Sequence, residues 1–420
     1  MKNIICMLCM TWGLSPLLLR AQEIVRLDSC YNWARQNYPM VRQLNLLALT
    51  MEYTVENASK AYYPQLTVNG QATYQSDVTQ VPVNLPNVQP ISKDQYKLYA
   101  ELTQMLYDGG TVRLQKDMLK AGAELEMQNV EVELYKLKER INQVFFGVLL
   151  IDAQIEQSAL LKKDMQSGLD RANASIINGA ALQSQADVIQ AEMLKVEQQV
   201  TALRTGRKAY IDVLKLMTGK NIETATFEKP VLPELLAPSV SIKRPELLYF
   251  DNRNKLVDIQ RKLVDARMKP RIGLFAQGGY GRPALNMLNN EFDFYYIGGI
   301  RLSWSLAGLY TSGYEKALLD VNYRLQEIQR ETFLLNTDVS LQQQNSEIRK
   351  YEELLKTDEQ IIVLRSRISD VTKAQFENGV INANDYLREL IAEDLARQNR
   401  LLHDMQLLMS RYQQKTITGN

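Results

Sequence analysis

The sequence has little of the chemistry on which most catalytic sites depend. Among 420 residues there are one His, three Cys and three Trp. A single imidazole argues against His-based zinc sites and against Ser-His or Cys-His catalysis, because such sites need two or more convergent groups. His403 lies in a polar-flanked helical pattern, so we expect a solvated side chain there. No nucleophile elbow, metal cluster or phosphate loop is recognisable, and we expect no enzyme activity, no metal site and no cofactor.

The chain also lacks a surplus of charge of either sign. It has 49 basic and 48 acidic residues, a formal net charge of +1. Binding of nucleic acid would need clustered excess Lys and Arg, so we expect no nucleic-acid partner.

Long apolar runs are missing after the N-terminus. Residues 1–21 combine Lys2, an apolar stretch and the segment Arg20-Ala21, which is typical of a secretory signal peptide. Removal of this segment would leave Cys30 as the only cysteine, so no intrachain disulfide is possible. No later run reaches the 18 apolar residues of a spanning helix, so an exported chain of this kind could enter a membrane only as a β-barrel.

The remaining sequence contains two copies of one pattern. Pro39 and Pro64 recur 206 positions later, whereas the matches beyond residue 102 recur at 200, as in Asn178-Gly179 and Asn378-Gly379. We predict a first structural repeat over 22–226, a proline-containing linker over 227–244 and a second repeat over 245–420. Neither copy is expected to form a domain alone.

Each copy contains two runs with period two, as strands have. They predict β-hairpins at about 65–105 and 271–304, with loops at 81–87 and 282–290. The clearest run places Phe292, Phe294 and Tyr296 on one apolar face and Asp293 on the other. Its length of about ten residues suits a tilted membrane strand with one face in lipid. A soluble sheet with one buried face is the alternative.

The rest is predicted to be helical. Apolar residues step by three and four in both copies, as in heptad seams; they are Leu134, Leu137, Ile141, Val144, Val148, Ile151 and Ile155, and then Ile361, Leu364, Ile368 and Val371. A proline-free stretch over 111–177 predicts one long helix. Shorter helices over 181–217 and 39–62 would together match its length, which favours a cylinder wall over a globular core.

Strand number then constrains assembly. Four strands per chain cannot close a barrel, because membrane barrels begin at eight. Two chains would supply 8 strands and three would supply 12, and strand counting does not choose between them.

Four motifs in order give the sequence a resemblance to the TolC-type outer-membrane efflux family over essentially the whole mature chain. They are 63–66 entering the first strand, 106–110 leaving the second, 244–247 opening the second copy, and 376–379 followed by 385–387. The resemblance implies a mainly α fold with a small β part: long antiparallel coiled-coil helices form a trans-periplasmic α-barrel that continues a transmembrane β-barrel. It also implies closure as a homotrimer.

The functional expectation follows from the resemblance. It implies a passive exit duct in the outer membrane of a Gram-negative bacterium, extending into the periplasm, for a tripartite efflux or type I secretion system. Its partners would be outer-membrane lipid, a periplasmic adaptor protein and an inner-membrane transporter such as an RND or ABC pump. A periplasmic coiled-coil scaffold with no pore is the alternative, although it leaves the apolar strand faces unexplained.

The resemblance also suggests site residues. Asp385 matches the family's first constriction aspartate, Arg388 stands where the second would be, and Asp187 matches the aspartate of the first copy at a shifted spacing. Helix N-terminal carboxylates favoured by the helix dipole are the alternative for both aspartates. The turns are candidate adaptor contacts or plain helix turns: Asn178, Gly179, Asn378 and Gly379.

Overall fold

The computed structural model describes residues 24–79, 90–234 and 241–420. The expected signal peptide, the loop predicted at 81–87 and part of the predicted linker lie outside these residues.

The chain divides into two compact units, and each contains parts of both sequence copies. Unit 1 comprises residues 1–38, 137–235 and 346–413, and unit 2 comprises 39–136, 236–345 and 414–420. Neither predicted repeat coincides with one unit, because the two longest helices, α3 (Thr111–Ile177) and α6 (Gly308–Glu377), each contribute to both.

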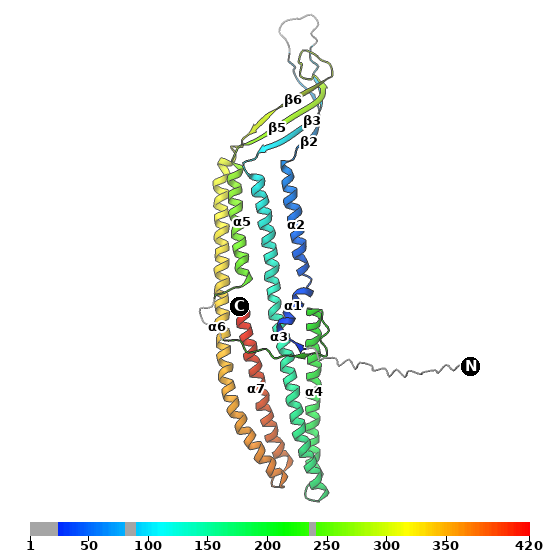
Figure 1. Ribbon diagram of the computed structural model, residues 1–420, viewed down its shortest axis with the longest axis vertical. Coiled ribbons are helices and arrows are strands. Elements are labelled where there is room, and N and C mark those ends of the chain that lie inside the picture. The colour runs from blue at the N-terminus through cyan, green and yellow to red at the C-terminus, as the bar shows by residue number, and fades with distance from the viewer. Residues whose placement is uncertain (1–23, 80–89, 235–240) are drawn as a thin grey trace, which may run out of the picture. The chain divides into compact units, whose positions relative to one another are not determined.

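Unit 2 contains a four-stranded antiparallel sheet with the order β2-β3-β5-β6 (Figure 1). Its strands are β2 (Gln65–Tyr74), β3 (Asp94–Tyr107), β5 (Arg271–Arg282) and β6 (Asp293–Ser303). The register pairs Leu66 with Leu102 and Tyr280 with Phe294, so the even-numbered apolar residues of neighbouring strands share one face. The two hairpins are therefore joined edge to edge through β3 and β5.

Four helical segments of unit 2 form a row. They are α6, α5 (Pro245–Arg267), α3, and α2 (Val41–Ser59) with the 3-10 turn η1 (Lys60–Tyr62), in the order seen in Figure 1. Polar side chains join α5 to both neighbours: Asn254 to Glu327 at 2.6 Å, Arg261 to Asp320 at 2.8 Å and Lys255 to Glu124 at 2.8 Å.

Unit 1 has a second row of four. It contains α6, α7 (Ala383–Thr418), α3 and α4 (Gln183–Thr218). Cross-helix bonds fix the order: Arg400 to Glu359 at 2.9 Å, Gln157 to Asp394 at 2.9 Å and Lys162 to Glu197 at 3.3 Å. The short helix α1 (Leu27–Asn37) and the parallel pair β1 (Ile24–Val25) and β4 (Thr226–Phe227) also belong to this unit.

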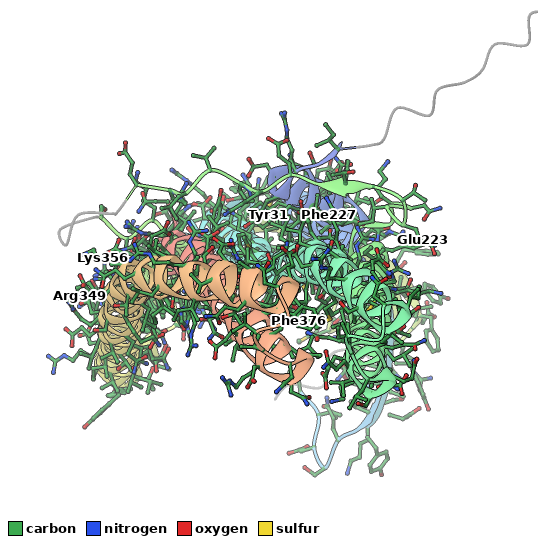
Figure 2. All side chains as sticks on the ribbon, turned by 90° about the horizontal axis from the view of Figure 1, so that it is seen from below. Tyr31, Glu223, Phe227, Arg349, Lys356 and Phe376 are labelled. Atoms are coloured by element: carbon green, nitrogen blue, oxygen red, sulfur yellow. The ribbon has the colours of Figure 1, made fainter. Side chains whose placement is uncertain are left out.

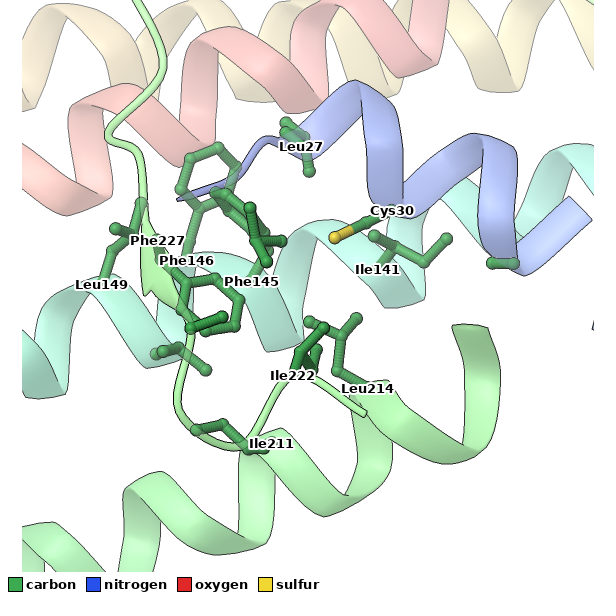
Figure 3. Packing of buried hydrophobic residues seen from close by; sticks show 14 of the residues in the cluster. Leu27, Cys30, Ile141, Phe145, Phe146, Leu149, Ile211, Leu214, Ile222 and Phe227 are labelled. Atoms are coloured by element: carbon green, nitrogen blue, oxygen red, sulfur yellow. The ribbon is translucent and has the colours of Figure 1, made fainter. Parts of the chain in front are cut away.

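The main core of unit 1 lies where α1 and β4 pack on α3 and α4 (Figure 3). Phe145 of α3 is fully buried and makes an edge-to-face contact with Phe227 of β4, with ring centroids 5.4 Å apart. Cys30 is buried in the same cluster, and burial raises the pKa of its thiol to about 12. A thiol held neutral in this way is chemically inert.

The first predicted seam is confirmed as a buried stripe. Five of its seven residues on α3 are less than a tenth exposed: Leu134, Leu137, Ile141, Val148 and Ile151. One stretch of α3 is also apolar enough to cross a membrane by length and composition alone. Several apolar residues of α3, among them Phe145 and Val148, pack into the core of unit 1, so we interpret α3 as a core helix.

The second predicted seam differs. On α6, Ile361, Leu364, Ile368 and Val371 are each more than a third exposed. The same stripe continues along the part of α6 in unit 2, with exposed Leu318, Val321, Leu325, Ile328, Leu335 and Val339. The apolar spacing is present as expected, but no described part of the chain covers this stripe.

The prediction for His403 is wrong. Its side chain is only 21% exposed, and its Nδ1 lies 2.6 Å from Oδ2 of the buried Asp358 on α6. The α6–α7 contact covers the imidazole, and only the tertiary structure reveals this contact.

Candidate site at the helix turns and the sheet

The turns that join α3 to α4 and α6 to α7 have the same backbone hydrogen bonds. Gly179 N donates to Ile176 O at 2.9 Å and Ala180 N donates to Ser175 O at 2.8 Å. The corresponding bonds of the second turn, from Gly379 and Val380, are 3.0 and 2.9 Å. This is the Schellman pattern, which satisfies carbonyl groups at the end of a helix.

Glycine is required at both turns by the backbone. Gly179 has φ +71° and Gly379 has φ +73°, in the left-handed region that side chains with a Cβ rarely adopt. Nothing lies within 4 Å of the position a Cβ would take at either glycine, so the turns are open on that side. The side chain of Asn378 donates to Ala374 O at 2.8 Å and closes the second turn further.

A side chain from α3 caps the end of α6. Arg171 donates through Nε and Nη2 to the carbonyl oxygen of Glu377, at 3.2 and 2.8 Å. A cation at a helix C-terminus also interacts favourably with the helix dipole. Arg171 therefore holds the two hairpins together near their turns.

Tyr386 anchors α7 to α3 in the same region. Its side chain is 1% exposed, stacks on Phe376 at a centroid distance of 4.9 Å, and donates its hydroxyl to Asp164 O at 3.2 Å. Figure 2, seen from below, shows Phe376 in the last turn of α6. A Cβ on Gly168 would lie 2.7 Å from the Tyr386 ring, so this glycine makes room for it. Burial raises the pKa of Tyr386 to about 12.

Asp385 lies in a group of alternating charges. Its backbone N–H donates to the side chain of Asn382 at 3.0 Å, which caps α7. Its carboxylate lies 3.4 Å from Arg388 Nη1, and Arg388 Nε donates to Glu389 at 3.1 Å. Glu389 also accepts a hydrogen bond from Arg365 of α6 at 2.9 Å. Two carboxylates thus face two guanidinium groups, and the group has no net charge.

Asp187 occupies a different position in its helix. Because α4 and α7 begin 200 residues apart, Gln185 corresponds to Asp385 and Asp187 corresponds to Leu387. Asp187 is exposed, and its carboxylate accepts a hydrogen bond from Gln183 at 3.1 Å. Within the described residues, no hydrogen bond or ion pair joins Asp187 to Asp385.

The sequence predicted Asp385 and Arg388 as neighbours but missed Tyr386, Arg171 and Gly168. The signal for Tyr386 was its place beside Asp385, since an aromatic residue within a polar helix start needs an explanation. The partners on α3 have no sequence signal, because they are more than 200 residues away. Among the described residues, no three His, Cys, Asp or Glu side chains lie close enough together to hold a metal ion.

The sheet presents its apolar side chains outward. Phe294 is 80% exposed and Tyr296 is 86% exposed, and further apolar residues of that face are also exposed: Leu66, Val68, Leu98, Ile300 and Leu302. The opposite face is polar; there Glu101 of β3 and Arg301 of β6 form an ion pair across β5 at 2.8 Å. An apolar face exposed this widely is not that of a soluble sheet packed on a core.

Sequence comparison finds no relative: no family model matches the chain, and neither does any curated protein. Solved structures do match. CusC, described in terms of transmembrane channel formation, has a TM-score of 0.68 at 12% identity, covering 93% of this chain and 91% of CusC. The CmeC outer-membrane channel of Campylobacter jejuni has a TM-score of 0.66 at 11% identity, covering 94% and 85%.

The open state of the MtrE outer-membrane channel of Neisseria gonorrhoeae gives a TM-score of 0.65 at 13% identity, covering 94% of this chain and 89% of MtrE. The chain therefore has the fold of the TolC-type outer-membrane channels. The similar structures are channels rather than enzymes, and identities this low establish the fold alone.

Proposed function

We propose that the protein is the outer-membrane channel of a tripartite efflux or type I secretion system in a Gram-negative bacterium. Three chains close a 12-stranded barrel in the outer membrane and a 12-helix tunnel through the periplasm. The channel is a passive exit duct without catalysis, and an inner-membrane pump supplies the energy. The outward apolar face of the sheet is the single observation that carries this proposal.

The strands support a lipid-facing role through length and pattern. They have 10 to 14 residues, enough for tilted membrane strands, and their apolar residues lie on one face. If the chain were soluble, that face would be in contact with water. Exposure of apolar surface to water costs a free energy of roughly 25 cal/mol for each Å². Lipid removes this cost, and the polar face then lines the lumen.

The exposed seam of α6 supports closure by identical copies. In each row of four helices, α6 is at one end, and α2 or α4 is at the other (Figure 1). The opposite ends also have exposed apolar residues: Leu46, Leu49 and Tyr53 on α2, and Leu194, Val213 and Leu216 on α4. Two different apolar ends fit a head-to-tail interface, which closes into a ring under threefold symmetry.

The charged group at the start of α7 is the proposed periplasmic constriction. Asp385 and Arg388 would approach the axis in three copies, and Asp187 would contribute from α4. Because Arg388 neutralises Asp385 within each chain, we expect weak cation selectivity. The two Asn-Gly turns are the proposed contacts of the periplasmic adaptor, which connects the channel to an RND or ABC pump.

The assembly experiment separates a channel from a periplasmic scaffold without a pore. Membrane fractions of cells that express the full chain are separated by density, extracted in detergent and run on gels with and without heating. We expect heat-modifiable trimers in the outer-membrane fraction and ion conductance after reconstitution in planar bilayers. A soluble periplasmic protein, or trimers that never conduct, would contradict the channel.

The constriction is tested by Asp385→Ala, with Asp370→Ala as the control because Asp370 is an exposed carboxylate of α6. Loss of Asp385 removes a partner of Arg388, so we expect a larger closed-state conductance and increased antibiotic susceptibility. The control should behave as the wild type. If Asp385→Ala has the conductance and susceptibility of the wild type, the assignment of the constriction is wrong.

A further inference from the structure

A cavity of about 250 Å³ lies on the polar face of the sheet, at the end where β2 begins and β6 ends. All of its lining belongs to unit 2. Its polar and aromatic lining includes Thr103, Arg271, Phe275, Arg301 and Ser303. Neither the turns nor the charged group at α7 contributes to it, so it is separate from the proposed constriction.

Glycine residues and a shift in strand register create the space of the cavity. Gly273 and Gly299 lie on the same face as Phe275, and a Cβ on Gly299 would be 3.2 Å from the Phe275 ring. The ring thus lies over a glycine. The ladder between β3 and β5 also shifts register between Met105 and Tyr107, at the edge of the cavity. Such bulges change the direction of side chains next to binding sites.

The cavity has an aromatic floor and a positive wall. The Arg301 guanidinium lies 4.5 Å from the centroid of the Phe275 ring, as in a cation–π contact. Arg301 is also fixed by its ion pair with Glu101. Arg271 has no carboxylate within 4 Å among the described residues, so its charge is not compensated. Ser303 is its direct partner in the β5–β6 ladder and offers a hydroxyl beside it.

We propose that this cavity binds small aromatic carboxylates. Arg271 and Ser303 donate hydrogen bonds to the carboxylate, and the ring of the ligand packs against Phe275. Arg301, already paired with Glu101, holds the Phe275 ring in place, and Arg271 supplies the uncompensated positive charge. The volume is slightly below that of pockets for drug-sized ligands, about 300–1,000 Å³, so a compound of one or two rings fits.

The charge balance decides against a cationic ligand. Two guanidinium groups, those of Arg271 and Arg301, line the cavity, and the described lining contains no carboxylate. Glu101, the partner of Arg301, lies outside the lining and is already paired. An organic cation would find no free acceptor of negative charge, whereas an organic anion finds one uncompensated guanidinium. A role of this cavity as a binding site for cargo on the lumen wall rests on the proposed channel function. Binding of an aromatic carboxylate to the cavity does not depend on that function.

Binding of 2-naphthoate to the purified, detergent-solubilised protein at pH 7.5 tests the proposal by isothermal titration calorimetry. The variants are Arg271→Gln and Phe275→Leu, and the matched control is Lys97→Gln. Lys97 is a cation on the same face of the sheet, paired with Gly281 at the other end and outside the cavity. Neutral 2-naphthalenemethanol measures the contribution of the ring alone, and protein-free micelles correct for partition into detergent.

We expect saturable binding of 2-naphthoate by the wild type and about tenfold weaker binding by Arg271→Gln, as for loss of one charge-assisted hydrogen bond. Lys97→Gln should match the wild type within about twofold. Phe275→Leu should weaken binding of both compounds, because both use the ring contact. This variant keeps Arg271, so it also tests the site if Arg271→Gln fails to fold.

Equal affinities of the wild type and Arg271→Gln, equal losses in Arg271→Gln and Lys97→Gln, or no saturable binding would each overturn the proposal. None of these results would contradict the proposed channel function, because conductance tests that function separately. Conversely, a protein that binds 2-naphthoate at Arg271 but conducts no ions would retain the site and lose the channel.

Discussion

The α3 and α6 helices have the same heptad spacing, but only α3 is covered within the chain. Leu137 of α3 is 5% exposed in the core of unit 1, whereas Leu364 of α6 is 57% exposed. Both helices belong to rows of four, but α3 lies inside each row and α6 lies at the end. The seam of α6, at the end of each row, is not buried by any described part of the chain.

The difference shows how one repeated pattern can serve two purposes. The first copy uses its seam for the core of a single chain, and α1, β1 and β4 add to that core. The second copy leaves its seam exposed, and we propose that assembly covers it. If this view is right, matched substitutions in the two seams will affect different properties.

The largest effect is expected for Leu137→Asn. An amide replaces a buried apolar group, so the chain should lose about 3–4 kcal/mol of unfolding free energy through lost burial and a poorly satisfied polar group. The midpoint of denaturant unfolding, followed by helical circular dichroism, measures this loss. An unchanged midpoint would contradict the buried position of the α3 seam.

Leu364→Asn is the matched change on α6. The helical signal of the chain should stay near that of the wild type. The proposed trimer should dissociate at a protein concentration about tenfold higher than for the wild type, because each copy loses apolar burial at the interface. Mass photometry across a dilution series measures assembly. If Leu364→Asn unfolds the chain but does not change the concentration at which the assembly dissociates, the α6 seam stabilises the single chain and not the assembly.

The junctions between sheet and long helix sharpen the comparison. Asp108, before α3, accepts hydrogen bonds from Val112 N at 2.6 Å, Gly110 N at 2.9 Å and the Tyr62 hydroxyl at 3.0 Å. The second copy has Gly308 at that position, and its junction instead uses Trp304 Nε1, which donates to Met268 O at 2.9 Å.

Burial alone would raise the pKa of Asp108, but these three donors outweigh burial and lower it. Its stabilising contribution is therefore present above the unfolded pKa and is lost as pH falls through the lower folded pKa. Asp108→Asn should cost about 1–2 kcal/mol at pH 7, because the three donors use both carboxylate oxygens and an amide has only one acceptor oxygen. The difference in unfolding free energy between the variant and the wild type should become smaller below about pH 4.

Thermal unfolding at several pH values tests the Asp108 prediction. Asp251→Asn on α5 is the control, because that carboxylate is exposed and should show no such difference. If the stability difference between Asp108→Asn and the wild type is the same at pH 3 as at pH 7, the carboxylate of Asp108 is not its cause.

The smallest effects are expected at the two turns, where the copies are alike. Gly179→Ala and Gly379→Ala should each cost about 1 kcal/mol, because alanine is strained in the left-handed conformation. Hydrogen exchange of the last turns of α3 and α6 should increase equally in the two variants. A clear inequality would show that the turns differ in their surroundings despite identical backbone bonds.

Local signals in the sequence predicted most of the elements. Asn178-Gly179 predicted the end of α3 at Ile177, since a glycine after a helix favours the left-handed turn. Alternating residues predicted the strands because their side chains point to opposite faces. The site was predicted less completely: Asp385 and Arg388 are neighbours on one helix, but Arg365, Arg171 and Asp164 come from other helices.

The sequence by itself determined the type and approximate length of the long helices and of the hairpin strands, and the existence of two seams, because these depend on local spacing and turn residues. It gave no signal for α1, β1 and β4. The tertiary structure decided which seam is buried, that His403 contacts Asp358, and that Arg271 and Phe275 line one cavity. Periodicity records that a face is apolar. What covers the face depends on contacts between residues far apart in the chain, and spacing along the chain does not encode them.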